Sequence, residues 1–240
     1  MNFPRALLAA AVVAATSCTA LLPLSPAQAA TVQVDGDLCF ISIGVQDMAA
    51  IRAEILQSDP LRLERIKAAL PGIDSELDLI SLELRAQALE RGTIKIEELS
   101  VAGQAAWSDF YLTGRQAGFA QNDLSALIIS IAAPEYLAVQ LDREFTPKLV
   151  GENTVSRVDA AEFVLQLEGY PAGLGVDLGN SKYFNYAITT QVKNILAPGV
   201  SSFEVLVDGV TQPYDDCAAG QSENPDNPFN TGGGSSFGSS

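Results

Sequence analysis

The spacing of hydrophobic residues changes twice along this chain. Apolar and polar positions alternate across residues 32–43, which predicts a strand bent at Asp35-Gly36-Asp37. Helical spacing follows as far as residue 168, with proline and glycine marking the breaks. The expected helices cover residues 46–57, 60–70, 75–91, 100–119, 124–133 and 135–144, and a further segment from Ala160 to Leu167.

Residues 75–91 show the clearest helical pattern. Leu77, Ile80, Leu84 and Ala88 fall on one face, and Gly92 stands where a C-terminal cap is expected. This segment is therefore predicted to be an amphipathic helix with one face in the core.

The predicted helix 100–119 carries Trp107, Phe110 and Tyr111 close together, and Gly114 and Gly118 weaken its last turns. Large aromatic side chains on one helix usually supply buried area, so we expect them to pack in the core. A ligand platform is the alternative.

The run from Leu124 to Ala133 is apolar enough to suggest a membrane span. Pro134 and Glu135 are expected to stop it at about half of the ~20 residues that a span requires. We therefore expect a buried helix here, followed by a second one, and no membrane span.

A period of two returns in the last third of the chain. Residues 174–178 and 183–192 flank a turn at Gly179-Asn180-Ser181 and predict a hairpin, and residues 203–207 predict another strand that turns at Asp208-Gly209. Helices come first and strands cluster late, framed by one early strand. This order favours an α+β fold over repeated βαβ units, with a small antiparallel sheet formed mainly by the C-terminal part.

The N-terminus has the features of an export signal. Arg5 precedes an apolar run from Ala6 to Ala15, and Ala27-Gln28-Ala29 matches a signal-peptidase site. Residues 1–29 are therefore expected to be removed, with a signal-anchor helix as the alternative. One domain, 30–217, is expected to follow, and then a disordered Gly/Ser-rich tail, 218–240. The predicted localisation is secreted or extracellular.

Removal of the signal changes the cysteine count. Cys18 is lost with it, and Cys39 and Cys217 remain in a compartment that permits disulfides. We expect them to pair, with two free buried thiols as the alternative. A bond closing so long a loop contributes up to ~4–5 kcal/mol in the chain-entropy model.

Charge and histidine content restrict the possible functions. The formal net charge is −15, which makes nucleic acid and anionic lipid headgroups poor partners. The 240 residues include no histidine, so the commonest metal ligand, the usual general base and every His-dependent triad are missing. We therefore expect no catalytic residue, no metal site and no cofactor, and binding is favoured over catalysis.

Several short motifs occur in an order typical of one family. A helix containing Glu64-Arg65-Ile66-Lys67-Ala68-Ala69-Leu70-Pro71 is followed by residues 74–77, a helix ending in Leu89-Glu90-Arg91-Gly92, Gly151-Glu152-Asn153, and a glycine-led hairpin over 173–191 with Tyr186 and Thr190-Gln191. Together they resemble the CAP family (cysteine-rich secretory, antigen 5 and pathogenesis-related proteins; SCP-like proteins in bacteria). The resemblance covers residues 64–191 and implies an α-β-α sandwich.

Departures from the family pattern limit what the resemblance implies about the site. The family's metal cleft uses two histidines, which this chain lacks, and Gly169-Tyr170-Pro171-Ala172-Gly173 replaces its Ser-x-x-His segment. The implied protein is a secreted, non-enzymatic binding protein of a bacterial cell envelope or extracellular space, with an unknown lipid, glycan or protein ligand.

Glu152 is the family position that carries over by motif. The resemblance places it on the floor of a cleft, joined by Asn153, Tyr183 and Tyr186. The alternative for Glu152 and Asn153 is structural, as loop and helix-start residues that bond backbone amides.

Two other functions stay open. A carboxylate-dependent cell-wall hydrolase needs only a pair of acidic residues, for which Glu152, Asp159, Glu162 and Glu168 are candidates. A helical extracellular interaction module would present a surface and lack a pocket.

Overall fold

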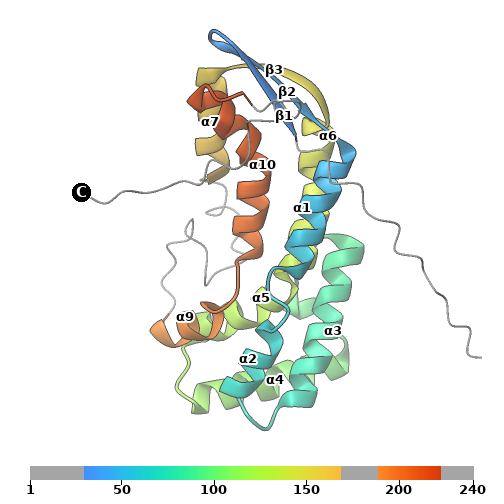
Figure 1. The fold of residues 1–240 in the computed structure, drawn as a ribbon. Helices are drawn as coiled ribbons and strands as arrows, with labels where there is room; N and C mark the ends of the chain where they lie inside the picture. The colour runs from blue at the N-terminus through green and yellow to red at the C-terminus, as the bar shows by residue number, and fades with distance from the viewer. Residues whose placement is uncertain (1–29, 169–188, 223–240) are drawn as a thin grey trace, which may run out of the picture.

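The molecule is elongated, with a small sheet at one end and a group of helices at the other (Figure 1). The computed structural model describes residues 30–168 and 189–222. Its three strands are β1 (Thr31–Asp35), β2 (Leu38–Ile43) and β3 (Gly151–Ser156), paired antiparallel in the order β1-β2-β3. A sheet this small is not stable alone and depends on the helices packed beside it.

The helical part alternates long helices with short connecting turns. Between β2 and β3 the chain forms α1 (Val45–Gln57), α2 (Arg62–Ala69), α3 (Asp74–Arg91), the 3₁₀ turn η1 (Ile96–Glu98), α4 (Val101–Gln116), α5 (Gln121–Gln140), the π-helical turn η2 (Leu141–Phe145) and α6 (Thr146–Leu149). After β3 come α7 (Arg157–Glu168), α9 (Thr190–Leu196) and α10 (Ser202–Ala219).

The segment predicted as one bent strand is instead a hairpin: β1 and β2 pair antiparallel, and the expected bend at Asp35-Gly36-Asp37 is the turn between them. Gly36 turns the chain with φ +62°, a conformation that favours glycine. Cys39, Ile41 and Ile43 of β2 are buried, whereas Leu38 and Phe40 on the other face are 47% and 46% exposed. Within the described residues, helices therefore cover one face of the sheet, which differs from the layering of an α-β-α sandwich.

The α+β class is confirmed, but among the described residues the sheet is not formed mainly by the C-terminal part. Residues 203–207, predicted as a strand, lie in α10, and residues 190–192 lie in α9. The sheet instead combines the N-terminal hairpin with β3, where Glu152 pairs with Ser42 and Asn153 with Ile41. Most of the predicted hairpin, including Tyr183 and Tyr186, lies outside the described residues.

The expectation that Pro134 ends a helix is wrong, because α5 continues through it to Gln140. Proline has no N–H, so the carbonyl of Ser130, four residues earlier, loses its helical donor. Arg62 replaces that donor: its Nη1 donates to the Ser130 oxygen at 2.6 Å. Arg62 is 5% exposed, and its Nε donates to Asp59 Oδ2 at 3.0 Å, so the charge is paired.

Two hydrophobic clusters lie along the length of the molecule. The first, near the sheet, joins β1, β2, α1 and the second half of α5 to α7 and α10, with Cys39, Ile55, Leu141 and Val207 among its buried members. The second joins α2, α3, α4, α9 and the first half of α5. Tyr136 packs against both, so α5 connects the two clusters.

The aromatics of α4 belong to the second cluster, as expected. Phe110 is fully buried, and Trp107 lies 5.4 Å from Phe110 and 6.0 Å from Tyr111, ring centre to ring centre. Trp107 and Tyr111 pack at the margin of the cluster. These side chains thus supply buried area rather than an open platform.

One helical stretch among the described residues, Gln121–Leu149, is long and apolar enough to cross a membrane by composition alone. Its most apolar window is 78% buried inside the protein. The two clusters already cover this apolar surface, which is typical of a core helix.

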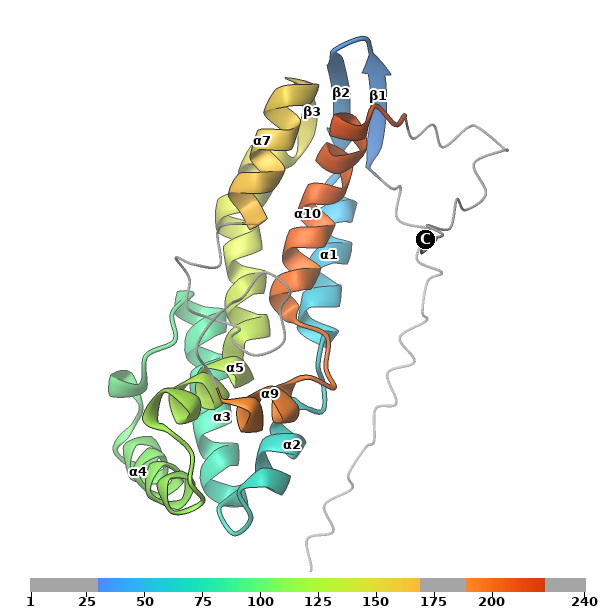
Figure 2. The ribbon, with the colours of Figure 1, turned by 90° about the vertical axis from the view of Figure 1, so that its left-hand side faces the viewer.

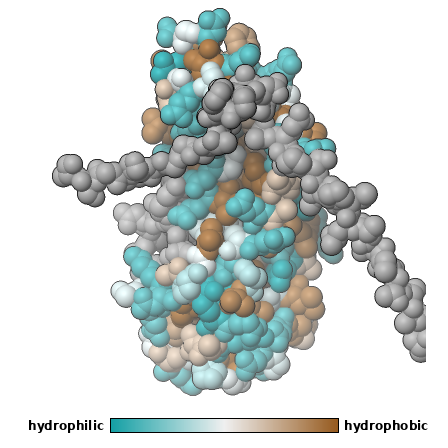
Figure 3. Space-filling model, in the orientation of Figure 1, coloured by the Kyte–Doolittle hydropathy of each residue, from teal (hydrophilic) through white to brown (hydrophobic). Residues whose placement is uncertain are grey.

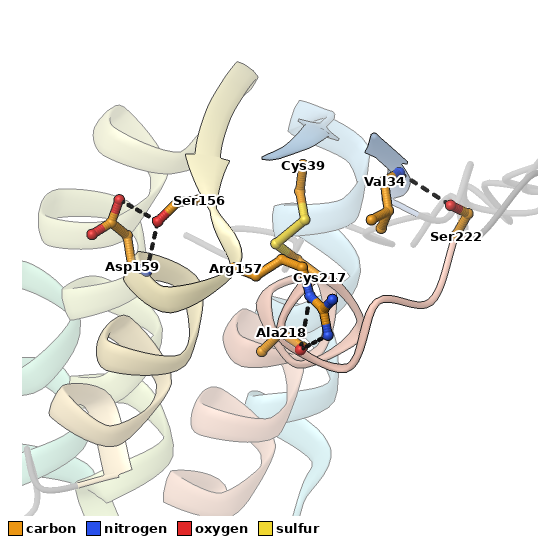
Figure 4. Close-up of a disulfide and its surroundings, with 8 residues drawn as sticks. All are labelled: Val34, Cys39, Ser156, Arg157, Asp159, Cys217, Ala218 and Ser222. Carbon is orange, nitrogen blue, oxygen red and sulfur yellow. Dashed lines mark hydrogen bonds between the residues drawn. A yellow bond between two sulfur atoms is a disulfide. The ribbon is translucent and has the colours of Figure 1, made fainter. Parts of the chain in front are cut away.

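A disulfide joins Cys39 of β2 to Cys217 of α10 (Figure 4). Both residues are fully buried. The ordered chain does not end there, in contrast to the predicted tail from residue 218: α10 runs to Ala219, and Ser222 Oγ accepts from the Val34 amide at 3.1 Å. Arg157 Nη2 donates to the Ala218 carbonyl at 2.9 Å and so caps the last turn of α10.

Candidate ligand-binding site

A hollow of about 350 Å³ lies between the η2–α6 segment and α7. Phe145, Leu149 and Leu167 form most of its floor and are no more than 8% exposed. Among the described residues, the lining consists of Glu144, Phe145, Lys148, Leu149, Phe163, Gln166 and Leu167. The volume falls at the lower end of the range for small-molecule sites, and an apolar floor with a few polar groups is their usual composition.

The π-helical turn η2 supplies one wall. The π-helical hydrogen bonds of this turn come directly before Pro147. Proline has no N–H, so Pro147 cannot donate to the Arg143 carbonyl. Thr146 Oγ1 donates to the Leu141 carbonyl at 3.0 Å and satisfies an oxygen at this irregular turn. Single π turns inside helices are frequent at functional sites, so the wall is consistent with a binding role.

The opposite wall is α7, whose Phe163 is held from behind. The rings of Phe163 and Tyr214 of α10 lie 4.4 Å apart at 40°. Burial raises the pKa of the Tyr214 hydroxyl. Because α10 is bonded to β2 through the disulfide, this wall belongs to the cross-linked end of the molecule.

The rim is polar. Lys148 Nζ and Glu144 Oε2 are 3.4 Å apart, with the two side chains 70% and 52% exposed. On the α7 side, Gln166 Nε2 donates to Glu162 Oε1 at 3.1 Å. The hollow therefore offers an apolar interior and a rim of charges and amide groups, a combination that suits a small amphipathic molecule.

A second hollow, of about 410 Å³, lies between the end of α1 and the α9–α10 connection. Its lining consists of Ala53, Glu54, Gln57, Ser58, Val200 and Val205. Ala53, Glu54 and Gln57 are exposed, and Val200 is 55% exposed. A ligand there would bury little apolar surface, so the hollow beside η2 is the stronger candidate.

The predicted site residues on β3 lie outside both hollows. Glu152 is exposed and stands opposite Ser42, on the face of the sheet that carries Phe40. Asn153 Nδ2 donates to the Leu149 carbonyl at 2.9 Å and so caps the end of α6, which differs from the bond to a backbone amide at a helix start that the structural alternative expected. A ligand-binding role for Glu152, Asn153, Tyr183 and Tyr186 stays a prediction.

The candidate carboxylates of α7 serve the helix itself. Asp159 Oδ2 accepts from Ser156 Oγ at 2.7 Å, and Ser156 Oγ accepts from the Asp159 amide, which closes the first turn (Figure 4). Glu162 accepts from Gln166 within the same helix. In the described ranges, no group of three or more His, Cys, Asp or Glu side chains could hold a metal ion.

The residues of the hollow were not singled out from the sequence. Phe145 and Leu149 are spaced i, i+4, and so are Phe163 and Leu167, which is also the pattern of ordinary core positions. The pairing of the two helices that leaves space between these residues is a tertiary feature, and no local signal marks it.

Comparisons with known proteins assign no relative to the chain. No family model, no curated protein and no solved structure matches it. Its function is therefore argued from the geometry alone.

Proposed function

We propose that this chain is a non-enzymatic binding protein of an oxidising compartment outside the cytoplasm, and that it holds a small, largely apolar molecule in the hollow between η2–α6 and α7. The observation that carries the proposal is the lining of this hollow: a buried floor of Phe145, Leu149 and Leu167 below a polar rim. The buried disulfide and the signal-like N-terminus support the compartment.

The chemistry of the lining favours binding over hydrolysis. Glu144 is the one carboxylate among the lining residues that the structure describes, whereas glycoside hydrolysis requires two placed about the bond to be broken. Asp159 and Glu162 are engaged within α7, and Glu152 lies on β3 away from the hollow. A CAP-like cleft at Glu152 remains an alternative proposal. An interaction module without a pocket is less favoured, because a hollow of ligand size is present.

Filling the hollow from its rim tests the proposal. Gln166 is exposed, so Gln166→Trp can be accommodated by α7 while the indole occupies the space above Phe163. Leu165→Trp is the control, because Leu165 is 68% exposed on the same helix and does not line the hollow. N-phenyl-1-naphthylamine, a neutral apolar dye whose fluorescence rises in apolar surroundings, is the probe.

The expected result is saturable dye binding by the parent protein and the control, and binding at least tenfold weaker in Gln166→Trp. Absence of saturable binding by the parent protein, or equal binding by both tryptophan variants, would contradict the proposal. Circular dichroism of the variants verifies that the helices are retained.

A further inference from the structure

The charges around the hollow are unequal in sign, and this restricts the ligand if the proposed function holds. Glu144 and Lys148 oppose one another at the rim. Glu162, bonded to the lining residue Gln166, and Glu168, next to the lining residue Leu167, both add negative charge from α7. Arg143, next to Glu144, donates to the Arg91 carbonyl at the end of α3 at 2.9 Å, so its charge is held toward α3. Among the described residues, carboxylates therefore outnumber cations around the hollow.

A second acidic group lies behind α7. Burial raises the pKa of the Asp215 carboxyl on α10, the hydrogen bond from Thr211 opposes the rise, and Glu168, Asp216 and Asp208 add to it. Asp216 is buried, and this burial raises the pKa of its carboxyl. The carboxylates that act on Asp215 show that negative charge gathers on this side of α7, and negative charge attracts cations.

The rim ion pair can be exchanged at low cost. Glu144 and Lys148 are one helical turn apart, and both are more than half exposed. Exposed pairs of this kind contribute about 0–1 kcal/mol. A ligand ammonium group can therefore take the place of Lys148 beside Glu144, while the lysine side chain turns into solvent.

We propose that the hollow takes a small cationic amphiphile, with an alkyl or aryl body on the floor of Phe145, Leu149 and Leu167, beside Phe163, and an ammonium group beside Glu144. The aromatic rings suit this ligand, because the face of a ring attracts a nearby cation. An anionic amphiphile of the same length would be attracted by Lys148 but repelled by Glu144, Glu162 and Glu168.

Three probes with the same ten-carbon chain separate head-group charge from apolar fit: decylamine, 1-decanol and decanoate. Isothermal titration calorimetry at low ionic strength measures their dissociation constants below the concentration at which micelles form. The inference expects decylamine to bind about threefold more tightly than 1-decanol, a difference typical of one exposed ion pair, and decanoate to bind most weakly. Added salt reduces the advantage of decylamine.

Two variants test whether Glu144 at the rim causes the preference for decylamine. Glu144→Gln should bring decylamine to the affinity of 1-decanol and leave the alcohol unchanged. Asp109→Asn is the control, since it removes one negative charge from an exposed position of α4, at the end of the molecule away from the sheet (Figure 2).

The outcomes distinguish this inference from the proposed function. Equal affinity for decylamine and 1-decanol, tighter binding of decanoate, or an equal effect of both variants overturns the cationic ligand and leaves the hollow as a binding site for an apolar molecule. Failure of all three probes to bind overturns both.

Discussion

Arg62 shows how one side chain allows a proline within a core helix. Its guanidinium bonds the Ser130 carbonyl that Pro134 leaves without a helical donor, and it pairs with Asp59, whose side chain is 2% exposed. Arg65 also bonds Asp59, and its Nε donates to the Ile195 carbonyl at 2.7 Å. Arg62 and Arg65 therefore tie α2 to α5 and α9.

Replacing Arg62 with methionine should destabilise the protein by about 3 kcal/mol, because it leaves a buried carboxylate with fewer partners and a buried carbonyl without its donor. The free energy of unfolding in urea measures this. Arg52→Met is the matched control: Arg52 and Asp142 form an exposed pair, 38% and 50% accessible, for which a loss below 1 kcal/mol is expected. Equal losses in the two variants would show that Arg62 has no special role at Pro134.

At the scale of elements, local pattern predicted those parts of the fold whose contacts are local. The helix over 75–91 formed as expected, with Gly92 as a left-handed cap at φ +67°, and the predicted bent strand is a hairpin whose turn lies at the predicted bend. The prediction that Pro134 ends a helix was wrong because the donor that the Ser130 carbonyl loses is replaced by Arg62 of α2, far away in sequence. Strand β3 was missed for a similar reason, since its exposed polar residues are ordered by pairing with β2.

The sequence of the last helix, α10, contains hydrophobic residues at both strand-like and helical spacing. Val205 and Val207 alternate with other residues as in a strand, and Asp208-Gly209 looks like a turn. Over a longer window, Phe203, Leu206, Val210 and Tyr214 repeat with helical spacing and are all buried. Gly209 is a close-packing position rather than a turn, because a Cβ there would stand 3.0 Å from Ile51 of α1.

The candidate site was less predictable than the fold. Phe145, Leu149, Phe163 and Leu167 are indistinguishable from core residues until two helices are placed beside each other. The motif-based candidates Glu152 and Asn153 lie on a strand whose partner is more than a hundred residues away in sequence. A site built from a gap between helices has no signature in one sequence.

Gly114 illustrates how a residue that weakens a helix can be required by its neighbour. A Cβ at this position would overlap the side chain of Leu124, which is fully buried and can move only by displacing its own neighbours in the core. Alanine for glycine in a helix normally stabilises by about 1 kcal/mol, but overpacking costs about 1–3 kcal/mol.

We therefore expect Gly114→Ala to destabilise the protein by about 1–2 kcal/mol, as measured by chemical unfolding. Ser108→Ala, at an exposed site on the same helix, should change stability by less than about 0.5 kcal/mol. A stabilising effect of Gly114→Ala would mean that α4 and α5 are not in close contact at this point.

At the scale of the whole molecule, the two hydrophobic clusters use the chain differently. The cluster near the sheet combines residues from both ends of the described chain, Val32 to Ile55 with Leu137 to Cys217. The other draws mainly on the middle, from Ile66 to Ala132. The cross-link therefore lies in the cluster that brings distant segments of the chain together. On the face in Figure 3, hydrophilic residues cover much of the helical end, with hydrophobic residues scattered among them.

Removing the disulfide tests whether the two hydrophobic clusters differ in stability. Cys39 and Cys217 are 178 positions apart, so the bond restricts most of the unfolded chain, and the double variant Cys39→Ala/Cys217→Ala should lose about 4–5 kcal/mol of stability. Native-state hydrogen exchange should locate the loss, because segments open in cooperative units of different stability. The amides of β1, β2 and α10 are expected to gain the most exchange, and those of α3 and α4 the least.

Reduction of the unaltered protein gives the same information if the double variant does not fold. Both sulfurs are fully buried, so alkylation of the reduced thiols requires the sheet end to open. Trapping should then follow the opening of β2 and α10 while the amides of α3 remain protected. A uniform loss of protection along the chain would instead show that the two clusters unfold as one unit. In that case the bond stabilises the molecule by restricting the unfolded chain as a whole, and the hollow beside α7 would be no more sensitive to reduction than the distant helices.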